Sequence, residues 1–405
     1  MRHISNSKET YSDLLTFTQS QQRKQKKKKK RGNMEIHVKT SDFLKAIQTV
    51  EGVVNTKLIK SVLSNLKIEA SDSKVFLSST DMELSLRTSI LSNVVKPGST
   101  SLPARQLASI FKTIHFPDSK ISVVSDPDNP LTLITDAEGK VETVFQINGM
   151  NPEEIKTIGE IPEEDITNIT TIILKDMIRK TYYAVATDEV RFVFNGLYFR
   201  SQGNLLTVVG TDGRRLARIN RSFPSALPFS EGIIIPHKTI REMMKVLEEA
   251  DLGKTGKIDG QFYIQIGNTE ILSKLIEGSF PDYEQVIPKD VKYKTKVNKE
   301  EFSIILKQAL ISAEEPSKQI RFHFQPGKLT VFASNPGTIQ FESTMRIDYS
   351  GEDLTIAFKG DYIADCIKSI DDLELEIQFS NSTTPVLFKD PSDTDYVAVI
   401  MPMKI

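Results

Sequence analysis

Apolar residues recur along the chain with the spacing of a buried helical face, and three stretches share one pattern. In each, apolar side chains occupy positions i, i+3, i+4 and i+7, which lie on one side of an α-helix. The stretches begin at Leu107, Ile240 and Ile363, so they are 133 and 123 residues apart. Such a spacing predicts an internal repeat. The stripes are Leu107/Ile110/Phe111/Ile114, Ile240/Met243/Met244/Leu247 and Ile363/Cys366/Ile367/Ile370.

A second series of helical stripes leads each repeat. Phe43/Ala46/Ile47/Val50 and Phe302/Ile305/Leu306/Ala309 match at an offset of 259 residues. The middle copy is looser, and we expect it at Ile178, Tyr182 and Val185, opened by Lys175 and Asp176.

Alternating β-rich runs separate the helices and are punctuated by Gly, Asn, Asp and Pro. Each repeat therefore reads helix, strands, helix, strands, which predicts an α+β fold of three repeated domains, each with two helices packed on antiparallel sheets. Examples of these runs are 74–77, 205–209, 328–332 and 373–379.

Two joints divide the repeats. Residues 149–165 are acidic and rich in Gly and Pro, and residues 278–291 hold two prolines and few periodic positions. We therefore expect domains at 34–153, 162–283 and 284–405.

The net charge of −1 hides an asymmetry, because residues 1–33 carry +8 and residues 34–405 carry −9. The leading segment ends in the cationic run Lys26 to Arg31 and lacks the apolar stretch of a signal peptide. One interpretation is a basic arm that touches nucleic acid. The other is a basic disordered extension, or upstream sequence before a natural start at Met34. We favour the second interpretation because a strand-like pattern follows Met34 at once.

The sequence contains little that indicates catalysis. None of HExxH, CxxC, GxSxG or GxGxxG occurs, and the five histidines show no paired metal-ligand spacing. We expect no cofactor and no metal. Cys366 is the only cysteine and lies on an apolar helical stripe, so core packing is expected and a reducing cytoplasm fits. No apolar run is long enough to span a membrane, so no membrane association is expected.

The polar sides of the repeated helices carry cations in register. Lys112, Lys245 and Lys368 are equivalent under the two offsets. Arg105 is equivalent to Lys238, whereas the third repeat has the acidic Asp361 at that position. A single lysine is more often a solvated surface residue. Recurrence in three repeats of an acidic protein instead favours one basic surface for the phosphate backbone of duplex DNA, without base reading.

The chain resembles the bacterial DNA polymerase III beta subunits, the sliding clamps, over residues 34–405. Together and in order, the motifs that carry the resemblance are highly specific. They are Ser79-Thr80-Asp81-Met82-Glu83, Val190-Arg191, Asn195-Gly196, Thr211-Asp212-Gly213-Arg214-Arg215-Leu216-Ala217, Phe280-Pro281-Asp282-Tyr283 and the ending Val399-Ile400-Met401-Pro402-Met403-Lys404-Ile405.

The resemblance implies a non-catalytic processivity factor of the polymerase holoenzyme. Its fold would consist of three DNA-clamp domains, and a ring would form from a head-to-tail homodimer around double-stranded DNA. Partners would be the DNA polymerase III alpha subunit, the clamp-loader complex and peptides of other replication and repair proteins. The less favoured alternatives are a metal-dependent nucleic-acid enzyme, such as a nuclease, and a sequence-specific DNA-binding regulator.

The resemblance also assigns site residues. Lys57 and Arg105 would contact DNA, with Arg191, Phe192 and Val193 near the hole. The dimer contact would bring Phe145 and Ile147 against Leu310 and Ile311 of the second copy. Arg214 stands where the family commonly has histidine, and Lys359 where asparagine is common. The implied partner-peptide pocket comprises Phe194, Thr211, Gly213, Arg214, Arg215, Leu216, Pro281, Val286, Tyr362, Val399, Met401, Pro402 and Met403.

Overall fold

The computed structural model describes residues 34–54, 62–124, 131–187 and 191–404. The chain divides into two compact units, each described by itself: residues up to Glu160 together with Asn268–Leu272, and residues Ile161–Gly267 with Ser273–Ile405. All strand pairings quoted below are antiparallel, as the alternating pattern predicts.

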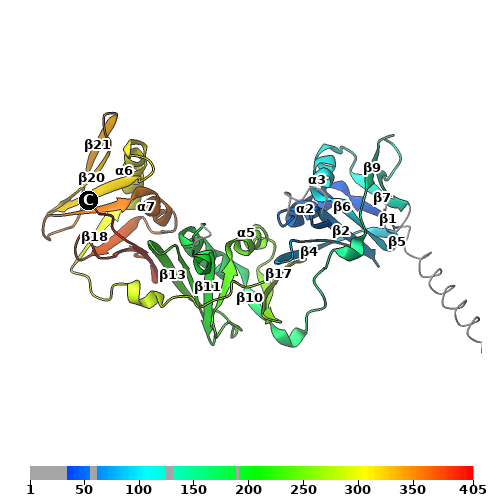
Figure 1. Cartoon of the computed structure of the whole chain (residues 1–405), viewed down its shortest axis with the longest axis horizontal. Coiled ribbons are helices and arrows are strands. Elements are labelled where there is room, and N and C mark those ends of the chain that lie inside the picture. The colour runs from blue at the N-terminus through cyan, green and yellow to red at the C-terminus, as the bar shows by residue number, and fades with distance from the viewer. Residues whose placement is uncertain (1–33, 55–61, 125–130, 188–190, 405) are drawn as a thin grey trace, which may run out of the picture. The chain divides into compact units, whose positions relative to one another are not determined.

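The first unit holds one repeat. Helices α2 and α3 pack on each other, and the rings of Phe43 and Phe111 lie 4.8 Å apart between them. One sheet has the order β5-β1-β7-β8-β9, and the other contains the run β17-β4-β3-β2-β6 (Figure 1). The elements are β1 (Glu35–Lys39), α2 (Thr40–Glu51), β2 (Asn65–Ser71), β3 (Lys74–Thr80), β4 (Leu84–Leu91), β5 (Asn93–Lys96), β6 (Gly98–Pro103), α3 (Ala104–Thr113), β7 (Asp118–Val124), β8 (Leu131–Asp136), β9 (Val144–Asn148) and β17 (Thr269–Ser273).

The second unit holds the other two repeats. One continuous sheet, β14-β11-β12-β13-β25-β24-β23-β18, takes strands from both, and β13 pairs with β25 from Arg215↔Ile400 to Ile219↔Tyr396. Its middle-repeat elements are β10 (Ile166–Thr170), α4 (Thr171–Thr181), β11 (Gly196–Gln202), β12 (Leu205–Thr211), β13 (Arg215–Ser222), β14 (Ile233–Pro236), α5 (His237–Val246), β15 (Leu252–Ile258) and β16 (Gln261–Ile266).

The last repeat places α6 and α7 against each other, with α6 on the sheet β21-β20-β19-β22. Aromatic side chains fill its core, since the ring of Phe322 lies 5.4 Å from that of Phe302 and 5.2 Å from that of Phe358. The elements are β18 (Tyr293–Asn298), α6 (Lys299–Ser312), β19 (Gln319–Gln325), β20 (Lys328–Asn335), β21 (Ile339–Arg346), β22 (Leu354–Lys359), α7 (Gly360–Ile367), β23 (Glu374–Phe379), β24 (Val386–Asp390) and β25 (Asp393–Ile400).

Helix starts confirm the predicted repeat. Helices α3, α5 and α7 begin at residues 104, 237 and 360, the same two offsets of 133 and 123 residues, and each follows a strand directly. Helices α2 and α6 begin at 40 and 299, an offset of 259.

The expectation for the middle leading helix was wrong. Helix α4 begins at Thr171 and ends at Thr181, before two of the three expected positions. Its buried stripe is Leu174, Met177, Ile178 and Thr181, which has the same i, i+3, i+4, i+7 spacing. The polar Thr181 concealed this stripe, since its hydroxyl is satisfied inside the helix by the Met177 carbonyl at 2.7 Å.

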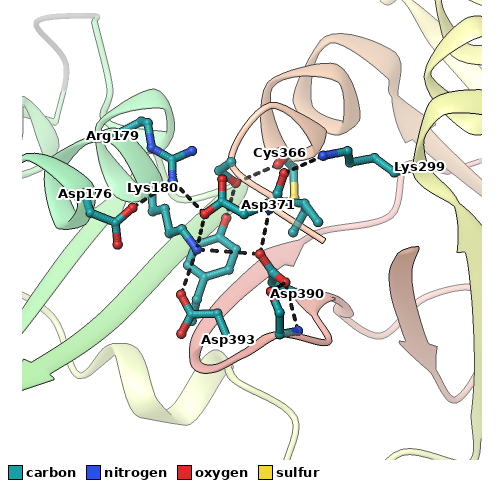
Figure 2. Close-up of polar contacts among 12 residues, drawn as sticks. Asp176, Arg179, Lys180, Lys299, Cys366, Asp371, Asp390 and Asp393 are labelled. Atoms are coloured by element: carbon teal, nitrogen blue, oxygen red, sulfur yellow. Dashed lines mark hydrogen bonds and ion pairs between the residues drawn. The ribbon is translucent and has the colours of Figure 1, made fainter. Parts of the chain in front are cut away.

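A buried ionic cluster links the middle and last repeats within the second unit (Figure 2). Lys180 at the end of α4 is 2% exposed, and its Nζ lies 2.7 Å from Asp393, 2.9 Å from Asp371 and 3.6 Å from Asp390. Arg179 binds Asp371 at 2.8 Å, and Arg221 of β13 binds Asp393 at 3.0 Å. We call Arg179, Lys180, Arg221, Asp176, Asp371, Asp390 and Asp393 the buried cluster, after its buried centre Lys180 and Asp390; Arg179 and Asp371 lie at its exposed margin. Because its members come from both repeats, it fixes the frame on which the site below is built.

Candidate functional site

The turn between β12 and β13 borders the site. Thr211 Oγ1 donates to the Arg215 carbonyl at 2.6 Å and accepts from the Gly213 amide at 3.0 Å. Asp212 Oδ1 accepts from the amides of Arg214 and Arg215 at 2.9 and 3.0 Å. Such side-chain to backbone bonds define the turn locally.

The first repeat contains the same turn, built from Thr80 and Asp81. Thr80 Oγ1 donates to the Leu84 carbonyl, and Asp81 Oδ1 accepts from the Glu83 and Leu84 amides. Met82 has φ 77° there, and Gly213 has φ 81°. The dihedral angle alone therefore does not require glycine. A Cβ on Gly213 would lie 2.3 Å from a guanidinium nitrogen of Arg191, so close packing of Arg191 requires it.

An apolar groove of about 280 Å³ opens beside this turn. Two of its lining residues, Leu216 and Val399, belong to an apolar cluster on the shared sheet, together with Val209, Leu387 and Val397. The segment 280–287 covers one side, where the ring of Phe280 stacks on Tyr198 with centroids 4.6 Å apart. The groove is lined by Arg191, Phe194, Thr211, Gly213, Arg214, Arg215, Leu216, Pro281, Asp282, Tyr283, Val286, Val399 and Met401.

Most predicted pocket residues thus come together, but three do not line this groove. Tyr362 lies in a neighbouring cavity of about 710 Å³. Pro402 lines neither cavity. Met403 is half-buried and is held by a hydrogen bond from its amide to the Ala357 carbonyl at 2.7 Å. Arg191, which was expected near DNA, lines both cavities.

The neighbouring cavity is polar and shares Arg191, Arg214 and Arg215 with the groove. The sequence analysis assigned no role here to Tyr182, Tyr183, His237 or Asp365, and the helical positions of these residues gave no signal. Burial lowers the pKa of His237, and Arg241 and Lys238 lower it further, so this imidazole is neutral near pH 7.

Arg215 is fixed between the two cavities. Its Nε lies 3.1 Å from Asp212 and its Nη1 lies 2.9 Å from Asp365. Its guanidinium also lies 4.4 Å from the ring centroid of Tyr362 and 5.6 Å from that of Tyr183. Burial raises the pKa of Tyr362, while Arg215 and Arg214 oppose that shift. Arg215 is therefore a preorganised part of the wall.

The predicted basic positions lie on polar helix faces within each unit. Arg105 and Lys112 are exposed on α3, opposite the buried Leu107, Ala108 and Phe111. In the second unit Lys245 is exposed and Lys238 is half-buried on α5, and Lys368 caps α7. Lys57 lies outside the described residues.

The three equivalent lysines differ in pairing. Lys245 binds the buried Glu242 at 2.6 Å, and Lys368 binds Asp365 at 3.1 Å. Lys112 has no ion-pair partner within the part of the chain that the structure describes. The local positive potential is therefore reduced at two of the three positions.

Three family descriptions match successive parts of the chain. They are the N-terminal, central and C-terminal domains of the DNA polymerase III beta subunit, at residues 34–159, 168–282 and 284–404.

The chain belongs to the DNA polymerase III beta subunit family.

Relatives and solved structures agree with this membership. The beta sliding clamp of Chlamydia muridarum is 28% identical over 379 residues, covering 92% of this chain and 99% of the relative. The beta subunit structure from Pseudomonas aeruginosa is 26% identical with a TM-score of 0.83, covering 92% of this chain and all of that one. A Bartonella birtlesii sliding clamp bound to griselimycin is 27% identical with a TM-score of 0.85, with the same two coverages.

Membership confirms the predicted fold class, three clamp domains of helices on antiparallel sheets. It also gives the function: the chain is a DNA polymerase processivity factor, a non-catalytic subunit of the holoenzyme that acts in DNA replication.

The described residues offer little that indicates other chemistry. Within the described ranges, no three His, Cys, Asp or Glu residues gather so as to hold a metal ion. The described helices include none long and apolar enough to cross a membrane. Cys366 is buried, and burial raises the pKa of its thiol to about 12, so the prediction of a core cysteine is confirmed.

The residues expected at a dimer contact lie on two elements of the clamp. Phe145 is half-buried on β9, and Ile147 on the same strand is already buried within its own unit. On α6, Leu310 is half-buried and Ile311 is 79% exposed. Phe145, Leu310 and Ile311 thus offer apolar surface, whereas Ile147 offers little.

Proposed function

We propose that two copies of the chain join head to tail into a ring that encircles duplex DNA and tethers partners through the apolar groove. The observation that carries this proposal is the groove itself, with Met401, Val399 and Leu216 on an apolar base and arginines at its rim. Thioether and aliphatic surfaces of this kind accept different short peptides by repacking.

Two edge strands support the ring. Strand β9 pairs only with β8, and β21 pairs only with β20, among the pairings within the described residues. Exposed edges invite pairing with another chain. Val144 on β9 and Ile311 on α6 are among the exposed apolar side chains, and a second copy would cover them. We propose Phe145, Ile147, Leu310 and Ile311 as interface residues. Ile147 would contribute the least surface to the interface, because it is already buried within its own unit.

DNA would be held without sequence preference. We propose Arg105, Lys112, Lys238, Lys245 and Lys368 as phosphate contacts, with Lys57, Arg191, Phe192 and Val193 nearby. Phe192 is 59% exposed, which leaves its ring free for an apolar contact. Each phosphate neutralised steepens the fall of affinity with salt by about 0.9 in the log–log slope. Weak contacts of this kind permit sliding, since retention is topological.

Partners of the groove would be the DNA polymerase III alpha subunit, the clamp-loader complex and clamp-binding segments of other replication and repair proteins. The full predicted pocket would extend from the groove into the neighbouring cavity at Tyr362, with Pro402 and Met403 following Met401 along the chain. We place the domain boundaries at 34–153, 162–283 and 284–405, and the protein in the cytoplasm.

Primer extension on a long single-stranded circle tests this proposal, with the cognate polymerase and loader. The wild-type chain is expected to lengthen the products of one binding event. Deletion of Met401 to Ile405 removes part of the groove wall and should abolish that stimulation while leaving a dimer in sedimentation. Full stimulation by the truncated chain would remove the groove from the mechanism.

A matched variant separates the ring from the groove. Ile311→Glu places a charge in the proposed interface and should yield monomers that bind partner peptides normally. A dimer of unchanged stability in Ile311→Glu would overturn the interface assignment.

A further inference from the structure

The rim of the groove carries three cations that have no ion-pair partner among the described residues. Among the described residues, Arg191, Arg214 and Lys359 have no carboxylate within ion-pair distance. Arg191 and Arg214 line both cavities, and Lys359 lines the larger one. We call these three residues the rim cations. Arg214 is exposed and Lys359 is half-buried, so their charged groups are accessible from the cavity.

We infer that the partner segments preferred by this clamp carry carboxylates immediately beside their apolar anchor, and that the rim cations select them. This inference rests on the proposed tethering function and adds the chemistry of the ligand. The anchor would occupy the apolar groove of about 280 Å³, and the carboxylates would lie in the adjoining polar cavity of about 710 Å³.

Tyr362 organises the cationic side of the larger cavity. Its ring centroid lies 4.4 Å from the Arg215 guanidinium and 5.1 Å from the Lys359 ammonium. Cations held over an aromatic face keep their charge and lose rotamer freedom before a ligand arrives. Lys359 is therefore presented to the cavity in a limited range of positions.

Most carboxylates that border the two cavities already have an ion-pair or hydrogen-bond partner within the protein. Asp212 binds Arg215, and Asp365 binds both Arg215 and Lys368. At the groove, Asp282 accepts hydrogen bonds from the Glu284 amide and the Gln285 side chain, which turn it toward its own loop.

Asp361 is the remaining acid of the larger cavity, and it has no ion-pair partner in the described part of the chain. It also lines the separate groove between α6 and α7, so it lies at the margin of the cavity. Within the described ranges, three cations without an ion-pair partner and one such acid border the cavities, which gives a net attraction for an anionic segment.

The glycine at position 213 supports the role of Arg191 as a rim cation. The Arg191 guanidinium packs directly over Gly213, at the boundary between the two cavities. A side chain at 213 would displace it. The turn therefore positions a cation where a bound segment passes from the apolar to the polar cavity.

Selection from a random decapeptide library tests the inference without assuming a motif. The dimeric wild-type clamp and an Arg214→Gln/Lys359→Gln variant are immobilised, and bound peptides are sequenced. We expect wild-type selections enriched in Asp or Glu within about three residues of an apolar pair, and loss of that enrichment in the variant. Lys294→Gln, which removes an exposed lysine of β18 outside both cavities, is the control and should select like wild type.

Binding constants then quantify the effect. For the best selected peptide, replacing its acids by the corresponding amides should raise Kd on the wild type on the order of tenfold at low salt, because two or three partly exposed ion pairs are lost. The same change should have little effect on the double variant. The difference should shrink as salt rises.

The outcomes separate this inference from the proposed function. Peptides that bind the groove without acidic enrichment, or that prefer acids equally in the double variant, would overturn the inference and leave tethering intact. Met401→Arg fills the groove and should prevent selection. Unchanged selection by Met401→Arg would instead reject the groove as the docking site, and with it the proposed function.

Discussion

Two groups of cations lie within the second unit, and they differ in what surrounds them. The buried cluster holds three cations and four aspartates, and Lys180 is 2% exposed. Figure 2 shows the Lys180 side chain pointing toward Asp371 and Asp393. The rim cations Arg191, Arg214 and Lys359 border cavities and have no carboxylate partner among the described residues. A paired, dry cation holds the fold, whereas an unpaired cation at a cavity is available to a ligand.

Removing a cation of the buried cluster should therefore change the free energy of unfolding more than removing a rim cation. A buried pair that loses one partner leaves an uncompensated charge in a poorly solvated place, which is costly. A surface cation that is removed changes stability little. Three predictions test this difference.

The largest effect is expected for Lys180→Met. It leaves Asp371, Asp390 and Asp393 without their central cation, and the free energy of unfolding should fall by about 3–5 kcal/mol. The chain has no tryptophan, so urea unfolding is best followed by far-UV circular dichroism. Arg214→Met is the matched control and should change stability by no more than about 0.5 kcal/mol. Equal effects of the two substitutions would erase the proposed distinction.

A smaller effect is expected for Gly213→Ala, and Gly203→Ala is its control. Both glycines have positive φ, but a Cβ at Gly203 would meet no atom within 4 Å, whereas one at Gly213 would collide with Arg191. Backbone strain should cost each variant about 1 kcal/mol of stability. Only Gly213→Ala should weaken peptide binding, measured by fluorescence anisotropy. If Gly203→Ala weakens binding to the same degree, the placement of Arg191 is not responsible.

The smallest effect near neutral pH is expected for the pH dependence of stability, which appears only at acidic pH. Burial raises the pKa of Asp393, but Arg221 and Lys180 lower it more, so its net pKa lies below the ordinary 3.8. Burial also raises the pKa of Asp371 and of Asp390, but Lys180 and Arg179 lower the first more, and hydrogen bonds from Ser392 and the Asp371 amide, helped by Lys180, lower the second more. A carboxylate with a depressed pKa in the folded state adds stability that is complete above its unfolded pKa and is lost as pH falls through the folded value. Unfolding midpoints should thus be flat near neutral pH and fall below about pH 4.

Lys180→Met sharpens this test, because without Lys180 the three carboxylates are less stabilised in their charged form. Its unfolding midpoint should depend less on pH below about 4 than that of the wild type. A parallel pH dependence in both proteins would mean that Lys180 does not set those pKa values.

Most of the fold could be predicted from the sequence, because the internal repeat is visible in the spacing of apolar residues. The starts of α3, α5 and α7 follow from their stripes and from the strand that precedes each helix. Helix α4 was misjudged because Thr181 completes its stripe with a polar residue whose hydroxyl is satisfied locally.

The site was less accessible from the sequence, except through the family resemblance. Lys180 and Asp393 are 213 residues apart, so no local pattern links them. Most residues that the resemblance implies for the pocket lie around one groove. Glu242 and Asp365 precede Lys245 and Lys368 by three residues, so the helical spacing could have indicated these two ion pairs, whereas Ser109 precedes Lys112.

Retention on DNA after loading tests the central claim most directly. The clamp is loaded on nicked circular duplex, purified by gel filtration in salt high enough to disrupt phosphate contacts, and then treated with an enzyme that cuts the circle once. The account predicts co-elution with the intact circle and release after cutting. Equal retention on the linear and circular forms would contradict an encircling ring.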